Sequence, residues 1–253
     1  MAKNMPENGK KTAYMVELAL MMALVVAVSF IPVLGYIPLV VIKATTVHIP
    51  VIIGAIILGP KAGAVLGLTM GVTSLIKYTI EPSLTSFVFS PFIPMPGTDS
   101  GDPRALLIAL VPRMMIGVVA GLVYKLFSLF DKKGFVACGA AALLGAMTNT
   151  GLVMGGIYLM FGKQYAAAIN VGIEMLGTFI MGVVATNGLA EAAVAMVLCI
   201  LLVRPLMNAL KRRSAAKAEK EELQEAAIEA AEAAKAETAV PAEAELKDPA
   251  ILD

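Results

Sequence analysis

The chain has 253 residues, of which 58% are hydrophobic and only 15% charged, and its mean hydropathy is +0.82. Soluble domains carry about 25% charged residues, so this composition excludes an ordinary soluble protein and predicts an integral membrane protein. The formal net charge of +1 hides an asymmetry, because residues 1–213 hold 16 basic and 8 acidic residues, whereas residues 214–253 hold 4 and 11.

Six apolar segments between residues 12 and 210 predict membrane-spanning helices, because one helical crossing needs about 20 apolar residues. In chain order they are 12–31, 47–59, 62–78, 105–129, 135–161 and 187–210. Lys and Arg in short flanking loops mark the cytoplasmic side. Four such clusters, at Lys3–Lys11, Lys61, Lys125–Lys133 and Arg204–Arg213, agree with both termini inside. The sequence therefore predicts an all-α membrane protein, a six-transmembrane-helix bundle with both termini cytoplasmic.

Two segments do not fit a simple six-helix scheme. From His48 to Gly59 there are 12 residues, about 18 Å of helix, so Gly35–Val47 is expected to run partly at membrane depth. Irregular backbone at that depth is tolerated where it lines a cavity or is buried in protein. Residues 166–184 are apolar apart from Asn170 and Glu174, and we expect a re-entrant or surface helix there rather than a seventh crossing.

The chain divides into three predicted parts: a cytoplasmic N-terminal segment 1–12, a transmembrane domain 13–213 and an acidic, Ala/Glu-rich cytoplasmic tail 214–253. The tail has few large apolar side chains and is expected to be disordered or partly helical. Because the N-terminus is polar, it is not expected to be a cleavable signal peptide. Cys138 and Cys199 lie in apolar runs and are interpreted as inert buried thiols. With one histidine and no CxxC motif, no metal site is expected.

Small residues recur every four positions, which keeps them on one helix face. The rows are Ala19, Ala23 and Ala27; Gly59, Gly63, Gly67 and Gly71; and Gly117 and Gly121. Small side chains let two helix backbones approach closely in lipid. The glycine rows are interpreted as packing inside the bundle, and the alanine row as either packing or a docking face.

Polar and ionisable residues in membrane spans are candidates for function. The candidates are Lys43, Thr46, His48, Arg113, Asn149, Asn187 and Glu191. Most of them fall in the outer half of the predicted bundle, where a solute site open to the exterior would lie. Each also has a structural alternative: Arg113 as a buried partner of Glu191 or Glu174, Asn149 as a bridge between helices, and His48 as a cap of its helix.

Several catalytic and energy-coupling motifs are missing. The sequence has no GxxxxGK[ST] phosphate loop, no HExxH and no GxSxG. It also has no ring of acids for a proton relay and no clear inverted repeat. We therefore expect no enzyme activity and no cofactor, and a recognition subunit driven by partners.

Over residues 13–210 the sequence resembles the substrate-binding S components of energy-coupling factor (ECF) vitamin transporters. The resemblance is carried by Ala19-x3-Ala23, His48-Ile49-Pro50-Val51-Ile52, Leu58-Gly59-Pro60-Lys61-Ala62-Gly63, the glycine row to Gly71, Pro112-Arg113 and Thr148-Asn149-Thr150. It implies a six-helix bundle in the bacterial cell membrane that binds one vitamin from outside with high affinity. It also implies a coupling transmembrane subunit and two ATPase subunits as partners, with no nucleic acid.

The resemblance further implies roles for individual segments. Ala19, Ala23 and Ala27 would form the face that docks on the coupling subunit. Gly35–His48 would close over the ligand, and the loop Phe87–Pro96 would help to gate the site.

The ligand is expected to be a water-soluble vitamin. The lack of Trp argues against a flat ring ligand, and Arg113 and Lys43 could pair with a carboxylate. The stretches Asn187–Glu191 and Thr148–Gly156 look like pantothenate-type members of the family. Pantothenate is therefore preferred, with riboflavin and folate open. Two alternatives from other classes are an ion-gradient-driven secondary carrier and a non-transporting membrane scaffold protein.

Overall fold

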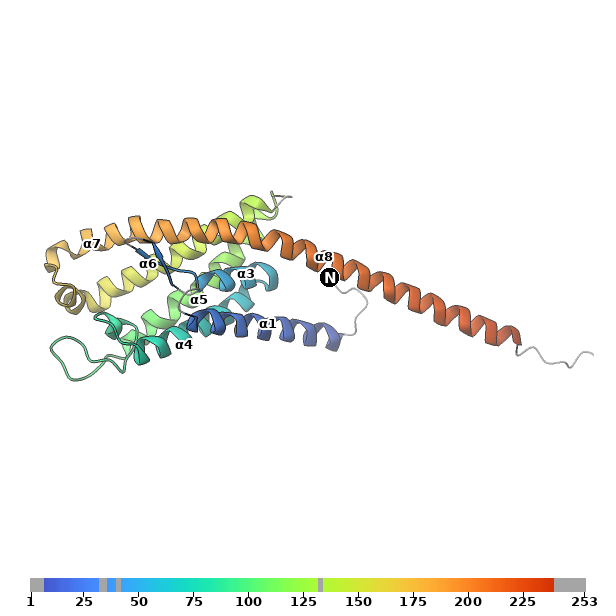
Figure 1. The fold of residues 1–253 in the computed structure, drawn as a ribbon, viewed down its shortest axis with the longest axis horizontal. Coiled ribbons are helices and arrows are strands. Elements are labelled where there is room, and N and C mark those ends of the chain that lie inside the picture. Colours follow the sequence, from blue (N-terminus) through green and yellow to red (C-terminus); the bar gives the residue numbers. More distant parts are fainter. Residues whose placement is uncertain (1–6, 32–35, 40–41, 132–133, 239–253) are drawn as a thin grey trace, which may run out of the picture. The chain divides into compact units, whose positions relative to one another are not determined.

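A computed structural model describes residues 7–31, 36–39, 42–131 and 134–238. Its helices are α1 (Glu7–Phe30), α3 (His48–Leu58), α4 (Pro60–Ile80), α5 (Arg104–Phe127), α6 (Phe135–Ala168), α7 (Leu176–Val183) and α8 (Leu189–Thr238). Short turns of helix are η1 (Ser86–Val88), η2 (Ile173–Met175) and η3 (Val184–Gly188), the last a π-helical turn. Met5–Met207 forms one compact unit, and α8 from Asn208 onward belongs to a second. Figure 1 shows the arrangement within the bundle.

Five described helical stretches are long and apolar enough to cross a bilayer. They are Lys11–Phe30, Pro60–Ile80, Arg104–Phe127, Phe135–Ala168 and Ile173–Ala209. The predicted span 47–59 is also a helix, but α3 has only 11 residues. The helical membrane architecture predicted from the sequence is thus confirmed, with one short crossing candidate in addition to the five long ones.

Residues 166–184 add no further long apolar stretch among the described residues, as predicted, but they do not form the separate helix that was expected. Helix α6 continues through Ala168, and the chain turns at Asn170, whose φ of 53° is left-handed. From Ile173 the chain is one apolar helical stretch that includes α7, η3 and the start of α8. Residues 166–168 thus end α6, and residues 173–184 are the first part of the last long helical stretch.

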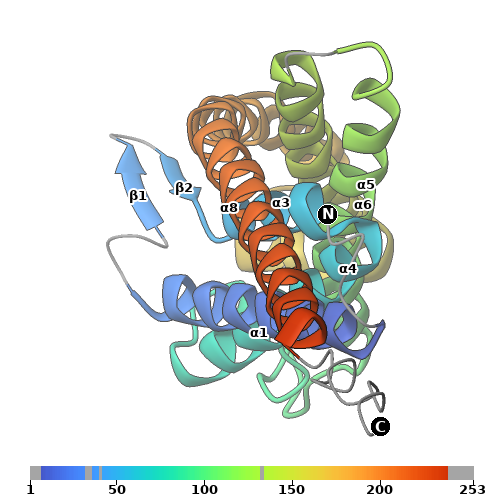
Figure 2. The same ribbon diagram turned by 90° about the vertical axis from the view of Figure 1, so that its right-hand side faces the viewer.

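The segment between α1 and α3 contains a two-stranded antiparallel hairpin, β1 (Tyr36–Leu39) and β2 (Ile42–Thr45). The register pairs Tyr36 with Thr45 and Leu39 with Ile42. The hairpin lies at the edge of the bundle (Figure 2), and β2 contacts η3. The predicted irregular backbone is therefore partly a regular hairpin, which satisfies its own backbone hydrogen bonds. Gly35 lies outside the described residues.

Helices α4 and α5 pack backbone to backbone through the predicted glycine rows. A Cβ atom added at Gly63 would lie 2.5 Å from the carbonyl oxygen of Gly117, and one at Gly71 would lie 3.0 Å from that of Ala109. At Gly63 only a residue without a side chain allows this approach, because real Cβ atoms do not come so close to backbone, and at Gly71 the neighbouring helix would have to shift slightly. The interpretation of the glycine rows as internal packing is confirmed for Gly63, Gly67, Gly71, Gly117 and Gly121.

The alanine row of α1 behaves differently. Ala19, Ala23 and Ala27 are all exposed, whereas Val25 and Ser29 on the opposite face are buried against the bundle. The buried face is joined to α4 by a contact of 3.0 Å between the hydroxyls of Ser29 and Thr73. The alanine row therefore lies on the side of α1 away from its buried residues.

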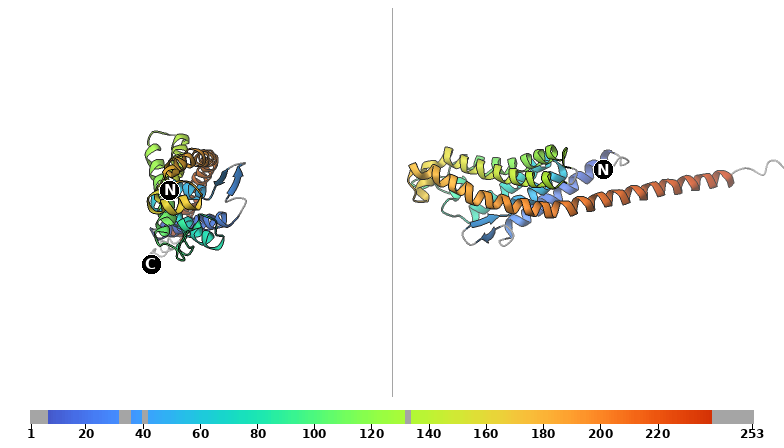
Figure 3. Two further views of the ribbon diagram at one scale, coloured as in Figure 1. Left: turned by 90° about the vertical axis from the view of Figure 1, so that its left-hand side faces the viewer. Right: turned by 90° about the horizontal axis from the view of Figure 1, so that it is seen from above.

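Helix α6 also packs along the helical stretch that begins at Ile173, and the two run side by side (Figure 3). A Cβ atom at Gly162 would lie 3.4 Å from the side chain of Leu176, and one at Gly139 would lie 3.5 Å from that of Met196. Between them, a Cβ atom at Gly188 would lie 2.9 Å from the methyl carbon of Thr150. The contact thus extends over most of the length of α6.

The bundle holds two separate hydrophobic clusters of buried side chains. The α3 cluster includes nearly all of α3, Ile116 and Ala120 of α5, Cys138–Ala146 of α6 and Ala192–Val203 of α8. The loop cluster is built on Phe87 and Val88 of η1 and includes Ile108 of α5, Val153–Ala168 of α6, and Leu176 and Ile180 of α7. The predicted burial of Cys138 and Cys199 is confirmed, and both thiols belong to the α3 cluster.

Candidate functional site

Polar residues occupy the interval between the two hydrophobic clusters on each of three helical stretches. On α6 the α3 cluster ends at Ala146 and the loop cluster begins at Val153, with Asn149 and Thr150 between them. On α5 the interval between Ile108 and Ile116 contains Arg113. On the last helix the interval between Ile180 and Ala192 contains Asn187 and Glu191. On each of these helices, buried apolar residues of the two clusters thus lie on both sides of the polar residues.

We call this set the polar layer: Tyr78, Arg113, Asn149, Thr150, Asn187 and Glu191. Helix packing and electrostatic interactions connect its members. Gly188, next to Asn187, packs on Thr150. The Tyr78 hydroxyl on α4 lies within electrostatic range of both Arg113 and Glu191. Four helical stretches therefore converge on one polar region, as expected from the shared depth of these residues in the sequence.

The interactions of Arg113 include a hydrogen bond and a cation–π contact. Its side chain is buried, with 6% of the residue exposed. Its Nη1 atom donates a hydrogen bond of 2.7 Å to the carbonyl oxygen of Ile108. Its guanidinium carbon lies 4.9 Å from the ring centroid of Phe89, within the range of a cation–π interaction. The charge is thus placed at a fixed point inside an apolar bundle.

Phe89 connects Arg113 to α4. Its ring stacks on Tyr78 with centroids 4.6 Å apart and an interplanar angle of 19°. Tyr78, Phe89 and Arg113 therefore form one continuous stack that joins α4, the loop after it and α5. The sequence analysis identified the loop Phe87–Pro96 but missed Phe89 and Tyr78 as individual site residues, because nothing in the local sequence shows which aromatic ring reaches Arg113.

Two buried polar atoms outside the stack have no hydrogen-bond partner among the described residues. They are the Oδ1 atom of Asn149 and the Nε2 atom of His48. A buried polar group without a partner costs about 1–3 kcal/mol. Such atoms can be satisfied by a bound polar solute. Arg113 and Asn149 both belong to the polar layer, so an anionic group and a hydrogen-bonding group could be recognised there together.

The residues around the start of α3 adjoin Val47 and Ile49, which belong to the α3 cluster. Thr46 and His48 are both buried. Val47 is the N-cap of α3, and no side chain caps this helix, so the interpretation of His48 as a cap was wrong. The backbone of Lys43 pairs with Pro38 in the hairpin, and the Lys43 side chain lies outside the described part of the structure.

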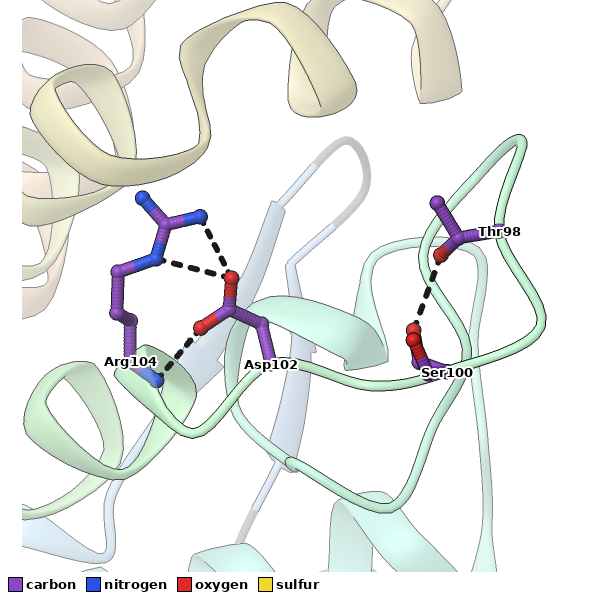
Figure 4. A network of polar contacts seen from close by, with 4 residues as sticks. All are labelled: Thr98, Ser100, Asp102 and Arg104. Carbon is purple, nitrogen blue, oxygen red and sulfur yellow. Dashed lines mark hydrogen bonds and ion pairs between the residues drawn. The ribbon is translucent and has the colours of Figure 1, made fainter.

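The loop between α4 and α5 is buried at its start and held by hydrogen bonds at its end. Ser86, Phe87, Val88 and Ser90 are buried, and Ser90 lies 2.8 Å from the hydroxyl of Thr79. At the other end, one Asp102 oxygen accepts a hydrogen bond of 2.8 Å from the Arg104 backbone N–H (Figure 4). The other oxygen accepts two hydrogen bonds from the Arg104 guanidinium.

Arg104 also anchors this loop to α6. Its guanidinium carbon lies 5.2 Å from the ring centroid of Phe161, and Phe161 meets Phe87 edge to face at 6.1 Å. Nearby, the Thr98 hydroxyl donates a hydrogen bond of 3.0 Å to the Ser100 carbonyl oxygen (Figure 4). Both ends of the loop are therefore held against the bundle, and its residue Phe89 contacts Tyr78 and Arg113 of the polar layer.

Comparison with known proteins decides the family. Residues 13–203 match the family model described as "ECF transporter, substrate-specific component". The chain belongs to this family. It is therefore a component of a membrane transporter that carries the substrate specificity, and its apolar helices are those of a multi-pass membrane protein.

Two curated relatives of this S component are similar over most of their length. One is the pantothenic acid transporter PanT of Lactococcus lactis subsp. cremoris (strain MG1363), which is 40% identical over 168 residues, 66% of this chain and 80% of the relative. The other is the pantothenate transporter PanT of Leuconostoc mesenteroides subsp. mesenteroides, which is 29% identical over 203 residues, 76% of this chain and 90% of the relative.

Proposed function

We propose that this S component binds pantothenate in the polar layer and delivers it for uptake. Both curated relatives are named as transporters of this vitamin. Pantothenate carries a carboxylate, an amide and two hydroxyl groups, so it needs one cationic partner and several hydrogen-bonding partners. The observation that carries the proposal is Arg113, the one buried Lys or Arg among the side chains that the structure describes.

In this proposal each polar residue has a role matched to its chemistry. Arg113 pairs with the carboxylate, since a guanidinium can bind a carboxylate through two parallel hydrogen bonds. Asn149 and His48 supply the buried polar atoms that the amide and hydroxyl groups satisfy. Thr46, Asn187, Glu191 and Lys43 complete the ligand-binding set, with the β1–β2 hairpin closing over it next to η3.

We further propose that the chain sits in the bacterial cell membrane as six transmembrane helices, with both termini and the acidic tail in the cytoplasm. The six are the five long apolar stretches and α3. The basic residues around the α5–α6 turn and after the last span support this orientation. In this proposal the chain has three parts: the N-terminal segment 1–12, the transmembrane domain 13–213, which binds the vitamin, and the tail 214–253.

The energy for uptake comes, in this proposal, from a coupling transmembrane subunit and two ATPase subunits. The exposed row Ala19, Ala23 and Ala27 is the face that docks on the coupling subunit. Small side chains there allow a partner helix to approach closely. A secondary carrier would instead drive uptake alone from an ion gradient, and a scaffold protein would bind no vitamin at all.

The test is calorimetric titration of the purified full chain with pantothenate, riboflavin and folate. We expect binding of pantothenate alone. Arg113→Met should weaken it about 10- to 100-fold, because a hydrogen bond to a charged group contributes about 1.5–3 kcal/mol. Arg212→Met, which removes an exposed arginine outside the bundle, is the matched control and should bind as the wild type does. Unchanged affinity in a folded Arg113→Met variant would exclude this site.

A further inference from the structure

Pro112 interrupts the hydrogen-bond ladder of α5 one residue before Arg113. Proline has no backbone N–H, so the carbonyl oxygen four residues earlier loses its helical donor. In α5 that carbonyl belongs to Ile108. Ile108 is only 2% exposed and is a member of the loop cluster, where a missing hydrogen bond is costly because water is absent.

The donor that reaches the Ile108 carbonyl is the side chain of Arg113, the residue after Pro112. Nη1 of Arg113 lies 2.7 Å from this oxygen. Side chains of helical residues point back toward the N-terminus of their own helix, so the guanidinium of Arg113 reaches naturally to the turn that Pro112 leaves open. The same direction brings it under the ring of Phe89.

These two contacts fix different degrees of freedom. The ring of Phe89, 4.9 Å from the guanidinium carbon, restricts where the guanidinium group can lie. The hydrogen bond to Ile108 sets the direction of one of its N–H bonds. A guanidinium has five N–H donors in a rigid fork, so fixing its position and the direction of one N–H together restricts the directions of the others.

We propose that Pro112 is a positioning residue for recognition of the substrate carboxylate. By leaving the Ile108 carbonyl without a backbone donor, it provides the acceptor that orients Arg113 in the polar layer. This inference rests on the proposed function, because it assigns to Pro112 the orientation of the residue that pairs with the carboxylate of pantothenate.

The inference can be tested specifically, because replacing Pro112 restores a backbone N–H that competes with Arg113 for the Ile108 carbonyl. In Pro112→Ala the new backbone N–H takes the Ile108 carbonyl, as in any regular helix. The guanidinium then loses the hydrogen bond that directs it, while its charge, its burial and the contact with the Phe89 ring remain. Alanine is the most favourable helix residue, so the variant keeps the helix itself.

The experiment compares two ligands that differ at one group: pantothenate and pantothenol, which has a primary alcohol in place of the carboxylate. Both are titrated into the purified full chain. The wild type should prefer pantothenate. Pro112→Ala should weaken pantothenate about 10-fold and leave pantothenol unchanged, so that the preference falls. Pro205→Ala, which replaces the proline inside α8, is the matched control and should keep the wild-type preference.

Two further variants make the result decisive. Adding Pro112→Ala to Arg113→Met should cause no further loss, because the proline acts only through the arginine. Pro112→Leu supplies the same backbone N–H with a larger apolar side chain and is measured in parallel, so that the outcome does not depend on one variant folding.

Equal loss of both ligands, or an unchanged preference in both folded Pro112 variants, would overturn the positioning role and leave the proposed function standing. A wild-type chain that binds no pantothenate would overturn the proposed function and this inference with it.

Discussion

Gly67 of α4 lies directly against the carbonyl oxygen of Arg113 on α5, and a Cβ atom at this glycine would overlap that oxygen. The backbone position from which Arg113 enters the polar layer is therefore set by a helix contact that only glycine permits. The contact has Gly63 and Gly71 one turn away on either side, so α4 cannot move away from α5 at Gly67 alone.

Gly67→Ala should therefore lower both the stability of the bundle and the affinity for pantothenate. Overpacking of a closely packed contact costs about 1–3 kcal/mol, and the displaced atom belongs to Arg113 itself. Thermal unfolding in detergent and ligand titration measure the two effects. Gly151→Ala is the matched control, since nothing lies within 4 Å of the added methyl group there. Equal behaviour of the two variants would contradict this reading of the contact.

Ala23→Trp should abolish assembly with the coupling subunit and leave pantothenate binding intact. Ala23 is exposed on the face of α1 opposite the buried Val25, so a large side chain there disturbs a partner and not the bundle. Co-purification of the tagged subunits measures assembly. The control is Leu24→Trp, at a neighbouring exposed position about 100° around the helix, which should assemble normally. Assembly of the Ala23→Trp variant would refute the docking face.

Ser29 and Thr73 should contribute only modestly to the α1–α4 contact. Ser29 lies 2.7 Å from the carbonyl oxygen of Val25, and Thr73 lies 2.9 Å from that of Met70, besides the 3.0 Å contact between the hydroxyls. Two hydroxyl protons cannot fill three hydrogen bonds, so the contact between helices competes with those inside each helix.

A double-mutant cycle of Ser29→Ala and Thr73→Val should give a coupling energy of about 0.6 kcal/mol, the average for such pairs in membranes. Reversible unfolding in mixed micelles provides the four stabilities. A coupling energy above about 2 kcal/mol would mean that one intrahelical bond is absent and that the pair is a principal α1 anchor.

Asp102 should make the start of α5 sensitive to acid. Hydrogen bonds from the side chain, and then from the backbone N–H, of Arg104 hold the pKa of the Asp102 carboxyl below its ordinary value of 3.8. A lowered pKa means that the folded state prefers the carboxylate. The stabilisation is therefore complete above pH 3.8 and is lost as the pH falls through the lower, folded-state pKa.

Hydrogen exchange of the Arg104 amide, corrected for its intrinsic pH dependence, measures this effect. At neutral pH Asp102→Asn should exchange faster than the wild type, and the difference should shrink at a pH below the folded pKa. Asp99→Asn, in the same exposed stretch of loop, is the control and should match the wild type throughout. A difference that persists at low pH would argue against the carboxylate as the cause.

Apolar length and the positions of Lys and Arg were enough to predict most of the helices. They were less successful over residues 166–184, where Asn170 and Glu174 suggested a re-entrant or surface helix. Lys163 and Glu174 are exposed on the surfaces of helical segments, so their charges do not interrupt those segments. The true break lies at Asn170, where a left-handed φ ends α6, and a single asparagine is a weak signal in the sequence.

From the sequence, the polar layer could be predicted only as a group of residues at a similar depth in the predicted helix bundle. Arg113, Asn149, Asn187 and Glu191 stand out because polar groups are rare in these spans. The stack of Tyr78 and Phe89 on Arg113 could not be predicted, because it depends on how the loop folds back over α5. The partner of Arg113 in that stack is 24 residues away in the chain, and several neighbouring aromatic residues are equally plausible from the sequence.

The π-helical turn η3 has a consequence for the helix that contains it. Leu176 and Gly188 both pack on α6, at Gly162 and Thr150. In an unbroken α-helix these residues, twelve positions apart, would point about 120° away from each other. A π turn holds one extra residue, which offsets nearly all of that rotation. Removing a single residue between Val184 and Gly188 would therefore rotate one half of this helix away from α6 while leaving its length almost unchanged.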